Sequence, residues 1–125
     1  MRYALALCLI LASCEKESNP VIPPPPTMSG RWDLVLVGTQ TLTGLLDITD
    51  NNGAITCTAS FLGATFNFSG TLSAQNVLAM YSYSGTNSLH VNATVTANKN
   101  SLSGRMTYYE GTTPVSYFDM TATKR

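Results

Sequence analysis

Charged residues are scarce in this 125-residue chain, which has seven Lys and Arg against seven Asp and Glu. Without a basic stripe, no binding to nucleic acid is expected. The chain has one histidine, His90, and its carboxylates are scattered, so no cluster has the spacing of metal ligands. Phosphate-loop and nucleophile motifs are also lacking. These shortages predict a protein that is not an enzyme and uses no cofactor or metal.

Long apolar runs are lacking too. Residues 3–11 give about half of the ~20 apolar residues that a transmembrane helix needs. Arg2 precedes this run and small residues follow it, which is typical of an export signal. The segment Leu11-Ala12-Ser13-Cys14 resembles the lipobox of bacterial lipoproteins. On the residues alone, an uncleaved signal or one cut elsewhere remains the alternative.

The lipobox resemblance implies an anchored protein. Residues 1–13 would be the signal peptide, and the Cys14 sulfur would carry a diacylglycerol, with acyl chains such as palmitate holding the chain on a membrane. In bacterial lipoproteins that stay in the inner membrane, the residue directly after the cysteine is commonly Asp. This chain has Glu15 at that position. We therefore expect a location in the cell envelope, with the outer membrane favoured, on its periplasmic or surface face.

Cysteine is too sparse for a disulfide framework. Cys8 lies in the signal and Cys14 is the lipid site, so Cys57 is left without a partner. Cys57 lies between Ile55 and Ala59 on an apolar strand face. We expect a buried, inert thiol there, with a reactive thiol as the alternative.

Residues 14–28 contain most of the proline. Pro23–Pro26 should form polyproline II, because proline fixes φ and lacks the amide donor. At ~3.1 Å per residue, such a tether holds a domain up to about 40 Å from the lipid surface. A ligand for a proline-binding module is the alternative interpretation.

From Ser29 onward no apolar period of 3.6 is present, so residues 29–125 are predicted to be one all-β domain. The turn residues between apolar segments are of hairpin length, as in Asp50-Asn51-Asn52-Gly53. The expected strands are 30–38, 41–49, 54–61, 64–73, 76–84, 88–97, 101–110 and 114–124. We predict an eight-stranded antiparallel up-and-down meander that closes into a small soluble barrel, because closure removes the exposed edges.

Alternation predicts which side chains face the interior. The inward set is expected to be Trp32, Leu34, Leu36, Leu42, Leu46, Ile48, Ile55, Cys57, Phe61, Phe66, Phe68, Leu72, Val77, Tyr81, Tyr83, Leu89, Val91, Val95, Leu102, Met106, Tyr108, Phe118, Met120 and Ala122. The opposite parity is mostly polar and includes His90, for which a surface position is favoured over a role as general base. Its apolar exceptions are Val35, Val37, Leu45, Leu78 and Met80. A polar exterior indicates a barrel that faces water rather than lipid.

A short repeat supports closure. Leu42–Leu46, Phe68–Leu72 and Leu102–Met106 share the order apolar, hydroxyl, Gly, any residue, apolar, and each glycine falls on the inward parity. Glycine there would allow a sharp bend and leave room for a bulky side chain across the lumen. Coincidence in a glycine-rich sequence is the alternative.

The first and last expected strands carry a second resemblance. Gly30-Arg31-Trp32 is similar to the Gly-x-Trp of lipocalins, and the Leu-Thr-Gly and Phe-Ser-Gly segments are similar to avidin-like sequences. The chain thus resembles the calycin group over about 97 residues. The resemblance implies that a cation of the last strand, here Lys124, packs over Trp32 and closes the base of the barrel.

Calycins bind ligands in the lumen, so the resemblance implies a small apolar or amphipathic ligand. The expected lining is Phe66, Phe68, Tyr81, Tyr83, Met106, Tyr108, Phe118 and Met120, with the tyrosine hydroxyls at the polar end of the ligand. The alternative is that these side chains simply fill the core, because an eight-stranded interior is narrow.

Two other functions remain open. The chain could be an envelope inhibitor or protein-interaction module that uses its tether or its barrel surface, with Leu45, Leu78, Met80 and Tyr117 as contacts. It could also be a cell-surface packing protein without a discrete ligand.

Overall fold

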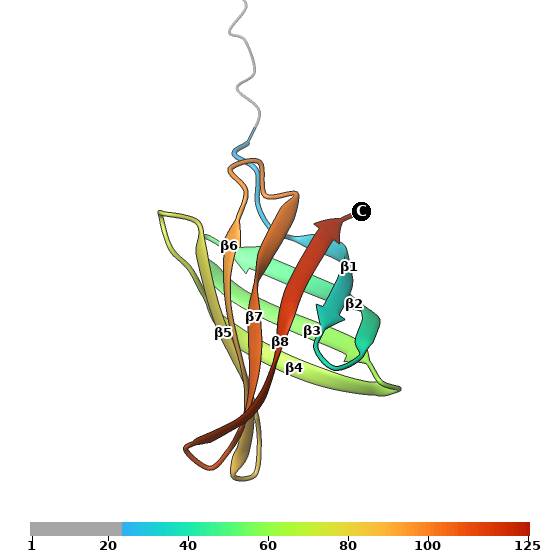
Figure 1. Ribbon diagram of the computed structural model, residues 1–125. Coiled ribbons are helices and arrows are strands. Elements are labelled where there is room, and N and C mark those ends of the chain that lie inside the picture. The colour runs from blue at the N-terminus through green and yellow to red at the C-terminus, as the bar shows by residue number, and fades with distance from the viewer. Residues whose placement is uncertain (1–23) are drawn as a thin grey trace, which may run out of the picture.

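The computed structural model describes residues 24–125 and folds them into a closed barrel of eight antiparallel strands, neighbours in space following the order of the chain (Figure 1). The strands are β1 (Gly30–Val37), β2 (Thr41–Asn51), β3 (Ala54–Phe61), β4 (Ala64–Leu72), β5 (Val77–Ser84), β6 (Asn87–Val95), β7 (Ser101–Glu110) and β8 (Thr113–Lys124). The predicted fold class is confirmed. In residues 24–125, no helix has the length and apolar character needed to cross a membrane.

Three predictions fall on residues outside this range. The signal peptide (1–13), the lipidated Cys14 and the larger part of the tether lie outside the described residues, so they stay predictions.

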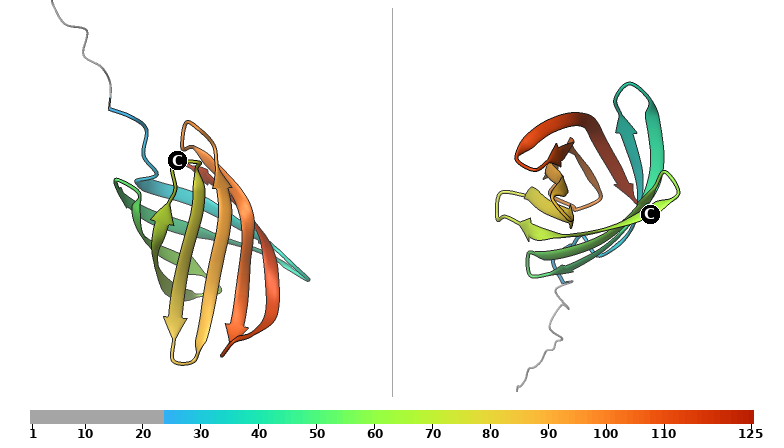
Figure 2. Two further views of the ribbon diagram at one scale, coloured as in Figure 1. Left: turned by 90° about the vertical axis from the view of Figure 1, so that its left-hand side faces the viewer. Right: turned by 90° about the horizontal axis from the view of Figure 1, so that it is seen from below.

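The barrel has two unlike ends. At the end called the base here, the entering chain and the C-terminus lie together (Figure 1). At the opposite, distal end, pairing is incomplete. Strand β4 pairs with β5 only from Ser69 to Leu72, and β1 pairs with β8 only as far as Val37 and Asp119. The β5–β6 and β7–β8 hairpins therefore extend beyond the rest of the barrel, while all strands curve around one interior (Figure 2).

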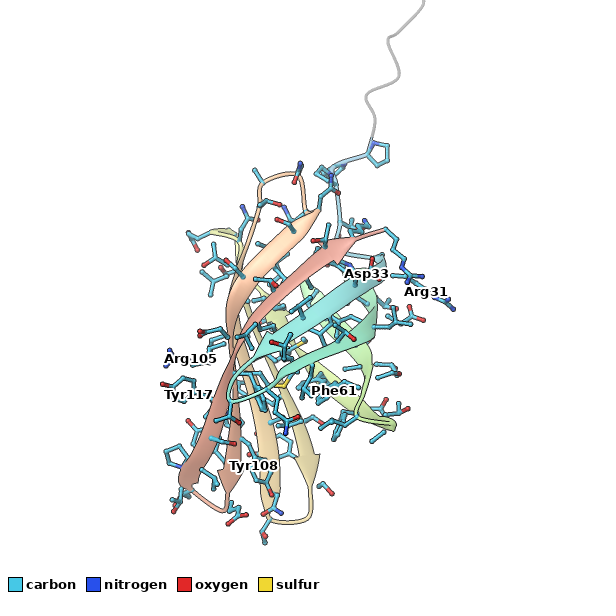
Figure 3. The ribbon with its side chains drawn as sticks, turned by 45° about the vertical axis from the view of Figure 1, so that its right-hand side comes forward. Arg31, Asp33, Phe61, Arg105, Tyr108 and Tyr117 are labelled. Atoms are coloured by element: carbon cyan, nitrogen blue, oxygen red, sulfur yellow. The ribbon has the colours of Figure 1, made fainter. Side chains whose placement is uncertain are left out.

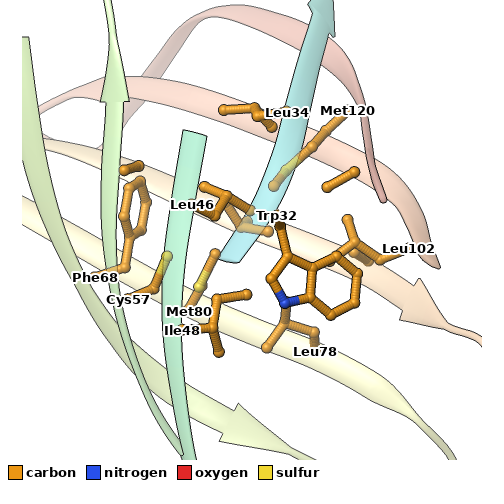
Figure 4. Close-up of a cluster of buried hydrophobic side chains, with 14 of the residues drawn as sticks. Trp32, Leu34, Leu46, Ile48, Cys57, Phe68, Leu78, Met80, Leu102 and Met120 are labelled. Atoms are coloured by element: carbon orange, nitrogen blue, oxygen red, sulfur yellow. The ribbon is translucent and has the colours of Figure 1, made fainter. Parts of the chain in front are cut away.

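The interior is a packed hydrophobic core. Figure 4 shows Trp32 beside Leu78 and Leu102, with Met80 and Met120 nearby. The largest fully buried side chains are Trp32, Met28, Leu34, Leu36, Leu46, Ile48, Ile55, Leu78, Met80, Met106, Met120 and Val91. Burial of this apolar surface is the main stabilising contribution to the fold.

In β5 the predicted facing was wrong. Leu78 and Met80 are buried in the core, whereas Val77, Tyr81 and Tyr83 are exposed on the outside. Both parities of this strand carry large side chains, so alternation within it was ambiguous. The pairing partners decide the facing, since Met80 lies opposite the core residue Val91 of β6.

The repeated glycines lie where neighbouring strands approach closely. A Cβ at Gly70 would collide with the Ala79 carbonyl oxygen and the Met80 Cα. At Gly44 it would collide with the Ser60 carbonyl oxygen, and at Gly104 with that of Asn92. The predicted role in the tight coiling of the wall fits these contacts, which are to the adjacent strand rather than across the lumen.

The entering chain is fixed to the base of the barrel. Met28, which the sequence placed in the tether, is 0% exposed and belongs to the core. Its amide donates a hydrogen bond to Asp50 Oδ2 at 3.0 Å, and Trp32 Nε1 donates to its carbonyl oxygen at 2.9 Å. The tether therefore ends at the base of the barrel, where Met28 is part of the core.

Lys124 closes the same end. It pairs opposite Trp32 across β1 and β8, as predicted. Its Nζ donates to the Thr27 carbonyl oxygen at 2.9 Å, and its stem lies against Gly30. Among residues 24–125, the Lys124 ammonium makes no cation–π contact with the Trp32 ring. Lys124 instead holds the entering chain at the base through its hydrogen bond to Thr27.

Candidate functional site

The structure divides the eight predicted lumen residues between the two faces of the wall. Phe68, Met106 and Met120 are buried in the core. Phe66, Tyr108 and Phe118 face inward and are half-buried toward the distal end. Tyr81 and Tyr83 face outward, so their assignment to the lumen wall was wrong.

Side chains fill the middle of the lumen. Leu34, Leu36, Met80, Met106 and Met120 have exposed fractions of 0 to 1%. Such side chains leave little room for a ligand among them, which is the usual outcome in an eight-stranded interior.

Aromatic and polar side chains form two rows across the outside of β5–β8, on the distal half of these strands. The first row runs Tyr81, His90, Thr107 and Tyr117, each opposite the next in register. The second runs Tyr83, Ser88, Tyr109 and Pro114. We call the outward side chains of these two rows, together with Asn92 and Arg105, the tyrosine face.

His90 lies at the centre of the tyrosine face. Its ring centroid is 4.8 Å from that of Tyr81, edge to face, and 4.4 Å from that of Tyr109. Tyr83 is farther away at 6.3 Å. These rings cover His90, and Ser88 beneath them is buried although it faces outward. The cluster is a packed aromatic platform rather than a set of independent side chains.

Ser88 Oγ lies 3.0 Å from His90 Nε2, which is a hydrogen bond. In the described part of the chain, no carboxylate bonds to the other nitrogen of the ring. A nucleophilic serine needs a base that a third group orients. The pair therefore fixes the orientation of the His90 ring.

Arg105 extends the platform toward β8. Its Cζ lies 4.0 Å from the centroid of the Tyr117 ring, and its Nη2 is 3.8 Å from Asp119 Oδ1. Figure 3 shows Arg105 and Tyr117 side by side on the outside of the barrel. A cation over an exposed ring stabilises the contact by about 0.5–1 kcal/mol, so Arg105 helps to hold the Tyr117 ring in place. The Asp119 carboxylate offsets the positive charge of Arg105.

An open groove of about 730 Å³ adjoins this platform. It is bounded by Val37, Gly38 and Thr39 at the β1–β2 turn, and by Thr107 and the distal part of β8. Tyr117 belongs to both the groove and the tyrosine face. The platform and the groove therefore form one continuous surface.

The residues predicted as contacts for a partner protein do not cluster. Leu78 and Met80 are buried, which contradicts that prediction for them. Leu45 is 39% exposed and lies opposite Asp33, whereas Tyr117 lies opposite Thr107. The surface formed around Tyr117 uses different neighbours from those expected.

Other polar groups of the described residues have structural explanations. Asp33 pairs with Arg125 at 2.9 Å and Asp47 with Arg31 at 3.9 Å, on the outer surface (Figure 3). Within residues 24–125, no three His, Cys, Asp or Glu side chains are grouped so that they could hold a metal ion. These ion pairs are exposed, so each contributes at most about 1 kcal/mol.

Cys57 is buried in the core, as predicted. Burial raises the pKa of its thiol to about 12, with a smaller contribution from the nearby Asp47 charge; a backbone hydrogen bond from Asp47 acts in the opposite direction. The thiolate is the reactive form, so the folded protein holds this cysteine in an unreactive state.

The sequence matches neither a protein-family model nor a curated protein. The sequence did not predict the tyrosine face, because Tyr81 and Tyr83 of β5 were expected to point into the barrel and in fact point outward. His90 and Tyr117 were correctly placed outside, and a shift of one residue in β5 brings Tyr81 and Tyr83 beside them.

Proposed function

We propose that this chain is a lipid-anchored binding protein of the bacterial cell envelope, and that it binds its partner on the tyrosine face. The exposure of Tyr83 (71%) and Tyr117 (56%) beside a continuous groove is the observation that carries this proposal. Exposed aromatic rings held by their neighbours are typical of binding surfaces, because they offer contact area at little entropic cost.

The direction of the tether supports the same function. The described chain enters at the base, where Met28 is locked into the core, and Tyr83 and Tyr109 lie next to the turns at the other end. A lipid on Cys14 and a proline spacer would attach the base to the membrane. The tyrosine face would then point away from the lipid surface, toward other envelope components.

The test compares surface variants of the full, lipidated chain in detergent. Delipidated cell envelopes of the bacterium that makes the protein are mixed with the chain and sedimented. The wild-type chain should co-sediment, and a chain with both Tyr83→Ala and Tyr117→Ala should remain in solution. Leu45→Ala removes an exposed apolar side chain from the opposite side of the barrel and should behave as wild type. Equal sedimentation of all three chains would contradict the proposal.

A lumen ligand is the second candidate function, and one observation favours it. Phe66, Tyr108 and Phe118 are only half-buried where β4 and β5 cease to pair. A small hydrophobic molecule held there would follow the calycin pattern. Native mass spectrometry of the chain purified from bacterial membranes should then show a lipid-sized bound mass. Its repeated absence, with no displacement of a fluorescent fatty acid, would exclude this candidate.

A further inference from the structure

The tyrosine face has the length of a short oligosaccharide. Tyr81 and Tyr117 stand on the first and fourth of four adjacent strands. At roughly 4.8 Å between strands, this row is ~14 Å long. Tyr83 and Tyr109 add a second row toward the distal turns. Rings repeated at this scale suit a ligand that is itself a chain of small repeating units.

Hydrogen-bonding groups border the rings. Thr107 lies between His90 and Tyr117 in the first row, and Asn92 and Arg105 form the next row toward the base. Sugar rings present apolar C–H groups on their faces and hydroxyls around their edges. Aromatic platforms bordered by amide, hydroxyl and guanidinium groups therefore match both parts of a sugar.

The charge of the surface favours an uncharged ligand. Arg105 is offset by Asp119 at 3.8 Å, and Glu110 is exposed at the distal turn. An acidic polymer would need an excess of cations, which this surface lacks. The two rows contain no Leu, Ile or Met, so their apolar area comes from the aromatic rings and Pro114.

From this combination we infer that the tyrosine face binds a neutral glycan, with sugar rings stacked on Tyr83 and on the face of the Tyr117 ring that Arg105 leaves uncovered, and with hydroxyls bonded to Asn92, Thr107 and Arg105. The inference rests on the proposed function and deepens it, because it names the chemical class of the partner. The groove beside Tyr117 continues the platform, so the glycan chain would extend past β8 toward the β1–β2 turn.

The experiment uses the same envelope material after two treatments. Periodate cleaves sugar diols, and a broad protease removes proteins. We expect the full chain to bind protease-treated envelopes and to lose binding to periodate-treated envelopes. The combined Tyr83→Ala and Tyr117→Ala chain should bind at least about tenfold more weakly, as loss of two aromatic contacts predicts. Leu45→Ala should bind as wild type.

The alternatives give different results. Binding that needs the two tyrosines, survives periodate and is lost after protease would overturn the glycan inference and leave the proposed function intact. Binding that does not need the tyrosines, or no binding to any of the envelope samples, would overturn both. Because Tyr83 and Tyr117 are mainly exposed, both variants should fold, which matched thermal melting curves would verify.

Discussion

Trp32 Nε1 donates a hydrogen bond to the carbonyl oxygen of Met28 at 2.9 Å, and both side chains are fully buried. This contact joins the end of the tether to the core of the barrel. An anchor at Cys14 would therefore place the base of the barrel nearest the membrane.

Met28→Ala should destabilise the domain although Met28 precedes the first strand. Truncation of a fully buried methionine costs about 2–5 kcal/mol of unfolding free energy. Urea denaturation measures the change, and Val77→Ala, at an exposed position of β5, is the matched control. A loss below about 0.5 kcal/mol, the usual surface value, would mean that the entering chain is not part of the core.

Gly70→Ala should be more destabilising than its size suggests. The new methyl group would collide with the backbone of β5 at Ala79 and Met80, and relief of the collision requires the strands to separate. Overpacking of this kind costs at least about 1–3 kcal/mol. Ser69→Ala, one residue earlier on the exposed face, is the control. Thermal melting should separate the two variants, and similar midpoints would refute the close approach of β4 and β5.

Cys57 should not react with a disulfide reagent in the folded state at pH 8 and should react fully in urea. Its raised pKa of about 12 keeps the thiol protonated when folded, whereas the ordinary value is 9.0. Because the pKa of the thiol is higher in the folded than in the unfolded chain, its contribution to stability is fully present below about pH 9. The unfolding free energy should therefore fall between about pH 9 and pH 12.

The measurement for that pH dependence is the unfolding free energy of the wild type and of Cys57→Ala across this range. The variant should be less stable at pH 8, because a buried side chain is shortened. The difference in unfolding free energy between the wild type and the variant should narrow as pH rises. A difference that stays constant to pH 12 would show that the thiol does not contribute.

Cys14→Ser should release the protein from the membrane fraction of cells, because the lipid would have no sulfur to attach to. Membrane fractionation followed by immunoblotting measures the distribution. Cys57→Ser is the control for loss of a thiol elsewhere and should leave the protein at the membrane. Continued membrane retention of the Cys14→Ser protein would contradict the lipobox prediction.

The strands and most inward-facing residues were predictable because polar and apolar residues alternate in most strands, with few exceptions such as Val35, Val37 and Leu45. In β5 the run from Val77 to Ser84 carries large residues on both parities, so only pairing with Gly70 and Val91 decides which face is buried. The tyrosine face depends on that choice. Its other contacts, such as Arg105 over Tyr117, arise from cross-strand register, which local sequence does not specify.

We propose that the partner binds outside the barrel and not in its lumen. Hydroxyl-radical footprinting of the full chain, with and without delipidated envelopes, reports on both surfaces at once. We expect protection of Tyr81, Tyr83 and Tyr117 on the outside, with the inward-facing Tyr108 and Phe118 unchanged. Protection confined to Tyr108 and Phe118, with the three outer tyrosines as reactive as in the free protein, would contradict this proposal.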